Sequence, residues 1–169
     1  MNTKLTGDIA EQATVLQGLL HGWGVLKPVG DRLAYDLVFD VDGTLLKVQV
    51  KSAWYDLGSD NYVIDNRRTK TNRRVMLREV YSLQDFDFAL GYIASLQVFY
   101  VFPVDVFISY GSEIHLVETD KRQRKPRSAE YREAWELISN RAAYKEICMC
   151  LPVKLGETCQ MVIPNQASE

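Results

Sequence analysis

The feature that most constrains this chain is an Asp42-Gly43 pair between two segments in which apolar and polar residues alternate. Asp-Gly is a preferred pair for the two-residue turn of a β-hairpin, so the flanking segments are predicted to form two antiparallel strands. With this pair as the turn, the register of the strands follows and places Asp36 directly opposite Gln49. The predicted strands span residues 35–41 and 44–51.

Successive side chains of a strand point to opposite faces, which gives the hairpin one polar and one apolar face. The polar face carries Asp36, Gln49 and Lys51 at adjoining positions. Directly opposed residues of an antiparallel pair have Cβ atoms about 4.5–5.5 Å apart, so these three side chains can converge on one small object. The apolar face, which we expect in the core, comprises Leu37, Phe39, Leu46, Val48 and Val50.

A divalent ion with a bound water is such an object, and this residue set suits phosphodiester hydrolysis. Mg²⁺ prefers oxygen ligands and keeps several waters, so one or two carboxylates with a carbonyl are sufficient protein ligands. Asp36 is the expected carboxylate, and the Gln49 side chain and the Val50 backbone offer carbonyl oxygens. Lys51 is expected to orient the attacking hydroxide and to carry positive charge toward the phosphate. We therefore predict Mg²⁺, or Mn²⁺, as cofactor.

The order of these residues resembles a known superfamily. A helix bearing Glu, a strand with Asp, a tight hairpin and a strand with (D/E)-x-K is the pattern of PD-(D/E)xK nucleases, here written Glu11, Asp36 and Gln49-Val50-Lys51. The strings GDIAEQ, GWGVLKPVGDRLAYDLVFD, QVKSAW, YVIDNRRTKTNRRVMLREVYS and FDFALGYI are similar to homing endonucleases encoded in bacterial group I introns, over roughly residues 3–138.

That resemblance implies a site-specific, metal-dependent endonuclease that cuts both strands of DNA. It makes Asp36 and Lys51 catalytic, has Glu11 support the metal, and puts Gln49 where most relatives have an acid. The neutral Gln49 removes one negative charge, so Glu11 gains importance and modest metal affinity is expected. Tyr35 stands where the motif has Pro, a residue that does no chemistry.

Three other functions stay open on the sequence. A catalytically inactive, sequence-specific DNA-binding module of the same fold is one, because Gln49 weakens the metal site. A Holliday-junction resolvase of the superfamily shares every catalytic residue. The third is a D-x-D-G-T phosphatase with Asp40 as nucleophile and Asp42 as general acid. That motif ends a parallel strand, whereas residues 44–51 continue as a strand, and no downstream acidic motif appears to hold Mg²⁺.

A dense basic run follows the predicted hairpin, in a chain whose formal net charge is only −2. Local clusters of Lys and Arg, rather than net charge, decide affinity for phosphates, and Arg and Asn can also read base edges. We therefore predict duplex DNA contact by Arg67, Arg68, Lys70, Asn72, Arg73, Arg74 and Arg78. A second run, from Lys121 to Arg127, is a weaker candidate for the same role.

The resemblance and the pattern together predict one α/β domain over residues 1–169, with a restriction-endonuclease-like central mixed β-sheet flanked by helices. One helix is predicted over residues 6–22, with an apolar stripe of Ile9, Ala13, Leu16 and Leu20, and another from Ser128. Further strands are predicted over residues 25–29, 61–66, 86–93, 98–104 and 113–117.

One active site cuts one strand, so a double-strand cut needs two. We expect a homo-oligomer, either a dimer or a dimer of dimers, on a long and nearly palindromic target. The helix from Ser128 and the tail beyond Ile138 are the predicted oligomer contact. No segment is apolar enough to predict a membrane span, and a cytoplasmic location with reduced Cys148, Cys150 and Cys159 is expected.

Overall fold

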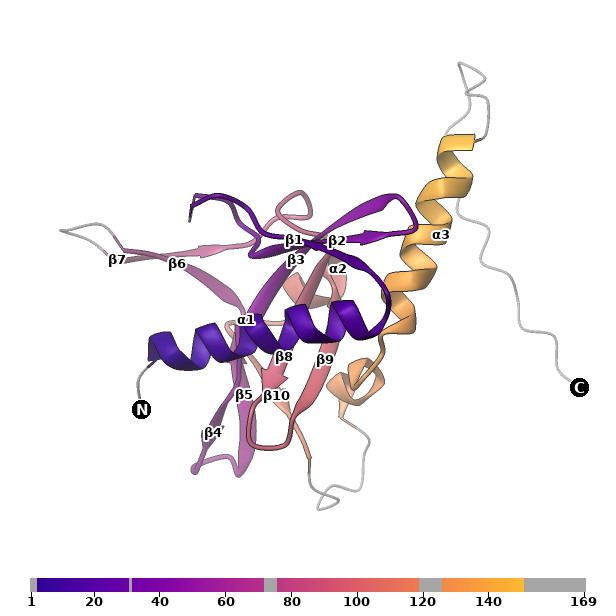
Figure 1. Ribbon diagram of the computed structural model, residues 1–169. Coiled ribbons are helices and arrows are strands. Elements are labelled where there is room, and N and C mark those ends of the chain that lie inside the picture. The colour runs from indigo at the N-terminus through magenta and orange to yellow at the C-terminus, as the bar shows by residue number, and fades with distance from the viewer. Residues whose placement is uncertain (1–2, 31, 72–75, 119–125, 151–169) are drawn as a thin grey trace, which may run out of the picture.

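A computed structural model describes residues 3–30, 32–71, 76–118 and 126–150 of the chain (Figure 1). Its central sheet has the strand order β1-β2-β3-β8-β9. The strands are β1 (Gly24–Leu26), β2 (Leu37–Val41), β3 (Thr44–Ser52), β8 (Phe88–Ile93) and β9 (Val98–Pro103). Because β3 and β8 are parallel while the other neighbours are antiparallel, the predicted mixed sheet is confirmed, with shifted strand ends.

The hairpin of β2 and β3 has the predicted register. Leu37 pairs with Val48, and pairing runs without interruption to the turn. Both turn residues have positive φ, 51° at Asp42 and 85° at Gly43, which is the left-handed backbone that a two-residue hairpin turn requires. All five residues of the predicted apolar face are buried.

Helix α1 (Thr3–Leu20) lies across the sheet (Figure 1), but the apolar stripe predicted for it is mostly exposed and does not form its packing face. The side chains of Ile9, Leu16 and Leu20 are 43%, 56% and 70% exposed, and Ala13 is only partly buried. The buried residues are Ala10, Thr14 and Gly18. These small residues let the helix approach the sheet closely: a Cβ added at Gly18 would lie 2.7 Å from Cε1 of Phe39. Residue size therefore overrides hydrophobicity in orienting α1.

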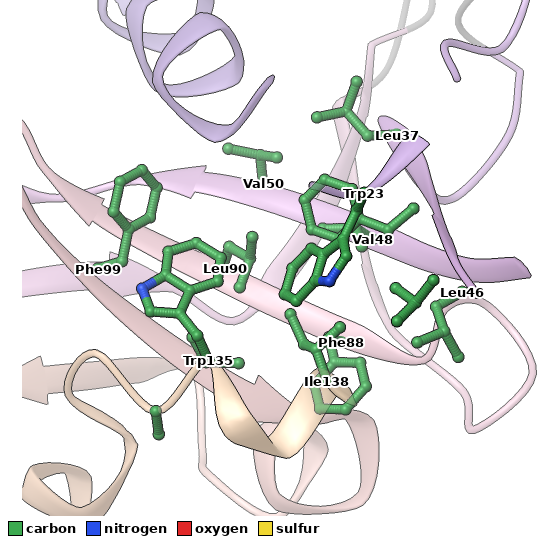
Figure 2. Close-up of a cluster of buried hydrophobic side chains, with 14 of the residues drawn as sticks. Trp23, Leu37, Leu46, Val48, Val50, Phe88, Leu90, Phe99, Trp135 and Ile138 are labelled. Atoms are coloured by element: carbon green, nitrogen blue, oxygen red, sulfur yellow. The ribbon is translucent and has the colours of Figure 1, made fainter. Parts of the chain in front are cut away.

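The face of the sheet that α1 covers is also covered by α3 (Glu136–Cys150). Figure 2 shows the core between them, where Trp135 and Ile138 pack toward Trp23, Leu90 and the β3 side chains. The helix predicted from Ser128 begins later, after the 3-10 turn Arg127–Tyr131. Glu133 causes this break, because it has a φ of 51° and its carboxylate accepts hydrogen bonds from Phe99 N and Trp135 Nε1.

The opposite face of the sheet is covered by a second, three-stranded sheet and one short helix. That sheet has the order β10-β5-β4, and its members are β4 (Trp54–Asp56), β5 (Asn61–Asp65) and β10 (Glu113–Leu116). Helix α2 (Val104–Ile108) adds Phe107 to this second core. The aromatic residues of β9 are buried, as expected of core rather than of a DNA-stacking platform.

Strands β6 (Arg67–Thr71) and β7 (Met76–Val80) form a separate two-stranded ribbon, which projects from the body of the molecule (Figure 1). Its root is fixed by Asn66, a buried residue whose Nδ2 donates to the carbonyl oxygens of Phe107, Tyr110 and Gly111. The basic run is therefore an arm held at one end by the second core.

Two further predictions concern segments of which little is described. Cys148 and Cys150 lie in the last turn of α3, where only the backbone is described, and Cys159 and the weaker basic run up to Lys125 lie outside the described residues. In the described part of the chain, no helix is long and apolar enough to cross a membrane.

Candidate active site

A cavity of about 460 Å³ opens where α1 crosses the end of β3. Three groups of residues line it: Thr3, Gly7, Ala10 and Glu11 from α1; Val50, Lys51, Ser52 and Trp54 from β3 and β4; and Asp65 and Arg67 beside the root of the arm. The cavity thus joins a predicted metal-supporting acid, the predicted catalytic lysine and the first residue of the basic arm.

Asp36 precedes β2, and its carboxylate is held by the hairpin partner strand. Its Oδ2 atom accepts hydrogen bonds from Val50 N at 2.8 Å and from Gln49 Nε2 at 2.5 Å. Burial raises the pKa of Asp36 above its ordinary value, the Val50 hydrogen bond opposes this rise, and the nearby negative charge of Glu11 adds to it. The predicted pairing of Asp36 with Gln49 is confirmed as a direct contact.

The Gln49 amide group marks a point where two oxygen atoms converge. Gln49 Nε2 lies 2.5 Å from Asp36 Oδ2 and 3.2 Å from the Val50 carbonyl oxygen. Both are ligands that Mg²⁺ favours, and rotating the amide would turn the Gln49 carbonyl toward the same point. Among the described residues, no three His, Cys, Asp or Glu side chains form a group that could hold a metal ion. The donor set fits a divalent ion held by few carboxylates.

Lys51 points into the site from the end of β3. Its Nζ donates to the backbone carbonyl of Arg67 at 2.8 Å and lies 5.0 Å from the ring centroid of Tyr81. Burial lowers the pKa of Lys51 to about 8, although the negative charges of Asp65 and Asp36 oppose this fall. A lysine with this pKa can exchange a proton near neutral pH.

Glu11 reaches the cavity from α1. It is on the cavity-facing side of the helix because Ala10, next to it, packs on the sheet. Its Oε2 atom pairs with Lys27 Nζ at 2.6 Å, and this contact raises the pKa of Lys27. Because the charge of Glu11 acts on Asp36, two carboxylates are held near each other, an arrangement that a divalent cation neutralises.

Residues 1–138 match the sequence family of PD-(D/E)XK endonucleases. The chain belongs to this family. It is also similar to the solved structure of a bacterial homing endonuclease, I-Ssp6803I, with 66% sequence identity and a TM-score of 0.81, covering 86% of this chain and 99% of that one. None of the curated proteins compared with the chain matches it.

As a PD-(D/E)XK endonuclease, the chain is a hydrolase that cuts DNA, as the sequence predicts. Nucleases of this family use divalent metal ions. The D-x-D-G-T alternative is not supported, because β2 and β3 are antiparallel and the residues concerned form a turn. There Asp40 Oδ1 accepts a hydrogen bond from Gly43 N at 3.0 Å, which is a turn contact.

Two charged residues of this endonuclease site were missed from the sequence. Lys27 follows β1 and meets Glu11 across the site. Asp65 ends β5, accepts a hydrogen bond from Arg67 N at 2.9 Å and lines the cavity with Lys51. Both residues lie within the strings that resemble homing endonucleases, but neither was singled out there as a site residue, and Asp65 directly precedes the basic run.

The predicted DNA-binding residues are partly described. Arg67 lines the cavity, and Arg68 donates to the backbone carbonyls of Arg32 and Leu33, which ties the arm to the loop before β2. Arg78 is 53% exposed and lies 3.8 Å from Asp65. The backbone of Lys70 is in β6, and Asn72, Arg73 and Arg74 lie outside the described residues.

Proposed function

We propose that this endonuclease is a site-specific homing endonuclease that cuts both strands of duplex DNA with Mg²⁺ or Mn²⁺ at the Asp36 site. The observation that carries the proposal is that Gln49 and Val50 of β3 hold the Asp36 carboxylate by hydrogen bonds. The next residue of the same strand, Lys51, lines the cavity together with Glu11. The similarity to a homing endonuclease over almost all of that protein supports the homing role.

Four residues are proposed to hold the ion: Asp36 and Glu11 by carboxylates, Gln49 by its side-chain carbonyl and Val50 by its backbone carbonyl. The bound ion supplies charge neutralisation at the phosphate and an acidified water. Glu11 must leave its ion pair with Lys27 to take part, and Gln49 must turn its amide. Both rearrangements cost free energy, so we expect a metal affinity below that of relatives with a third acid.

Lys51 is proposed to act on the attacking water and on the phosphate. Its ammonium group carries three donors, one of which now contacts the Arg67 carbonyl. The others can bind a non-bridging phosphate oxygen and the attacking water. In its neutral form, which the lowered pKa makes accessible near neutral pH, the amine instead accepts a proton from that water through its lone pair, and the positive charge of the resulting ammonium stabilises the pentacovalent phosphate.

The β6–β7 arm is the proposed DNA-reading element. A two-stranded ribbon fits the major groove, where Arg and Asn can pair with base edges. Arg67, Arg68, Lys70 and Arg78 are spread along its strands, and Asn72, Arg73 and Arg74 come between the strands in sequence. Because Arg67 also lines the cavity, the arm is continuous with the catalytic site.

A cut through both strands calls for two such sites, so we propose that the protein works as a dimer or a dimer of dimers on a nearly palindromic target. The whole chain, residues 1–169, is proposed to act as one domain, in the cytoplasm, where it meets its DNA.

The test is Mg²⁺-dependent cleavage of a plasmid library carrying candidate target sites. Wild type is compared with Asp36→Asn, Lys51→Ala and the matched control Asp40→Asn, which alters a carboxylate that accepts a hydrogen bond in the hairpin turn. We expect site-specific linear product from wild type and the control, and at least a hundredfold less from the other two variants. Equal cleavage by all four proteins would remove Asp36 and Lys51 from the mechanism.

Binding of the same DNA, measured by fluorescence anisotropy in Ca²⁺, separates loss of catalysis from loss of fold. Both site variants are expected to bind within about threefold of wild type, since the arm carries most of the contact with phosphates. If wild type binds its target but never cuts it, with either Mg²⁺ or Mn²⁺, the protein is a DNA-binding module instead. Preference for a branched over a linear duplex would identify a junction resolvase.

A further inference from the structure

The outer face of α1 is apolar although nothing in the described chain covers it. Five large aliphatic side chains of this helix are at least two-fifths exposed: Leu5 (55%), Ile9 (43%), Leu16 (56%), Leu19 (58%) and Leu20 (70%). At 100° per residue, Leu5, Ile9, Leu16 and Leu20 fall on one stripe, opposite the face formed by the buried small residues. Apolar side chains scattered singly over a surface are ordinary, whereas several large ones aligned on one helix face are typical of an interaction surface.

The four stripe residues are spaced symmetrically about the middle of the helix. Leu5 and Ile9 are separated by one turn, and so are Leu16 and Leu20, with the midpoint between Gln12 and Ala13. If two copies of α1 pack antiparallel about a twofold axis through this midpoint, Leu5 meets the partner's Leu20 and Ile9 meets the partner's Leu16. Such self-complementarity is what an isologous contact requires.

We propose that the outer face of α1 is a contact surface between two copies of this chain, packed antiparallel through the stripe Leu5, Ile9, Leu16 and Leu20. This surface differs from the oligomer contact predicted from sequence, which was the helix from Ser128 and the tail beyond Ile138. The double-strand cut proposed above also calls for two copies, and that part of the support rests on the proposed function. The apolar pattern of α1 supports the contact independently of the proposed function.

The contact leaves the catalytic site open. Glu11 lies on the opposite, cavity-facing side of α1, and none of the four stripe residues lines the cavity. A membrane surface is a poorer occupant. Helices that lie on membranes carry Lys and Arg beside the apolar face, whereas α1 has one cation, Lys4, against Asp8 and Glu11.

The first test is sedimentation equilibrium of the full chain without DNA. Protein concentrations of about 1 to 100 μM allow dissociation constants in the micromolar range to be measured. Wild type is compared with the double variant Ile9→Glu/Leu16→Glu and with Leu96→Glu, a control that alters an equally exposed leucine in the β8–β9 turn. The dissociation constant should rise on the order of a hundredfold in the double variant, because each change acts twice across a twofold contact. The control should match wild type.

A monomeric wild type, or a double variant that associates like wild type, overturns the proposal. The second outcome leaves an oligomer built on another surface, so the proposed function survives it. Plasmid cleavage assayed on the same samples reports separately on the proposed function, whatever the association shows. Circular dichroism of each variant checks that α1 remains folded.

A crosslinking test does not depend on a destabilised variant. In a background with the three natural cysteines replaced by serine, Ile9→Cys and Leu16→Cys proteins are oxidised mildly, alone and mixed. Antiparallel packing predicts a disulfide-linked heterodimer in the mixture and little product from either protein alone, since bridged Cα atoms must lie within about 7 Å. Self-linked product from each single variant would indicate parallel packing, and no product at all would place the contact elsewhere; either result refutes the proposal.

Discussion

Lys51→Met should make the protein more stable at neutral pH while removing its activity. Lys51 is charged in a site that disfavours charge: its pKa falls from 10.5 to about 8 because of burial. That difference corresponds to roughly 3.4 kcal/mol of destabilisation when the lysine is protonated in both states, since one pKa unit is worth about 1.4 kcal/mol. Methionine fills a similar volume without the charge.

The net gain is smaller than this figure for two reasons. Lys51 is only partly buried, so solvent screens some of its charge. The substitution also removes the hydrogen bond to the Arg67 carbonyl, which costs about 1 kcal/mol. We therefore expect Lys51→Met to raise the free energy of unfolding by about 2 kcal/mol at pH 7, or a melting temperature gain of roughly 4–8 °C for a chain of this size.

The pH dependence gives the sharper result. Below the folded pKa of about 8 both states hold the proton, and the full penalty acts on the wild type. Between about 8 and 10.5 the unfolded state holds more protons, so wild-type stability rises with pH and the penalty disappears. The advantage of Lys51→Met should therefore shrink from pH 7 to pH 10, as followed by urea unfolding in EDTA with tryptophan fluorescence.

Lys47→Met is the matched control. Lys47 lies on the same face of β3 and also donates to a backbone carbonyl, that of Gln84, but it does not line the cavity. Its substitution should bring no gain in the free energy of unfolding at pH 7, because Lys47 does not line the cavity. A Lys51→Met variant that is less stable than wild type at pH 7, or whose advantage is the same at pH 10, would refute the reasoning from burial.

Three further predictions concern the metal site and α1. Gln49→Glu adds a carboxylate beside Asp36, so calorimetry should show Mn²⁺ binding at least tenfold tighter than in wild type; unchanged affinity would exclude this side chain as a ligand. Lys27→Met frees Glu11 and should lower the Mg²⁺ concentration for half-maximal cleavage, whereas a higher requirement would make Lys27 part of the catalytic apparatus. Gly18→Ala should cost about 1–3 kcal/mol in urea unfolding through overpacking, unlike the control Gly7→Ala, which has open space; equal effects would contradict the close packing.

The parts of the site that could be predicted from sequence are those fixed by short-range geometry. A two-residue turn sets the register of the strands it joins, and the register alone brings Asp36, Gln49 and the Val50 backbone together. The contacts that sequence reasoning missed come from distant segments. Lys27 lies 16 positions from Glu11, and Asp65 ends a predicted strand whose place in a second, separate sheet no local pattern indicates.

The proposed catalytic residues also show why rules based on packing and stability do not predict a functional site. A buried lysine, and a buried carboxylate that a second carboxylate destabilises further, both work against folding, and no packing rule would select them. Their cost is offset elsewhere, by a sheet whose inner faces are almost wholly aliphatic and aromatic. Charged residues at partly buried positions of an otherwise regular hairpin therefore indicate a functional site.

The error about α1 has a different origin. The periodicity of Ile9, Leu16 and Leu20 predicts a buried face, and within one chain that face is exposed because the small face of Ala10, Thr14 and Gly18 fits the sheet more closely. A helical period of apolar residues indicates a helix face that is shielded from water. The period does not tell whether the same chain or another chain covers that face. If a second copy covers the stripe, the hydrophobic pattern described the assembled protein correctly and only its assignment to the monomer core was wrong.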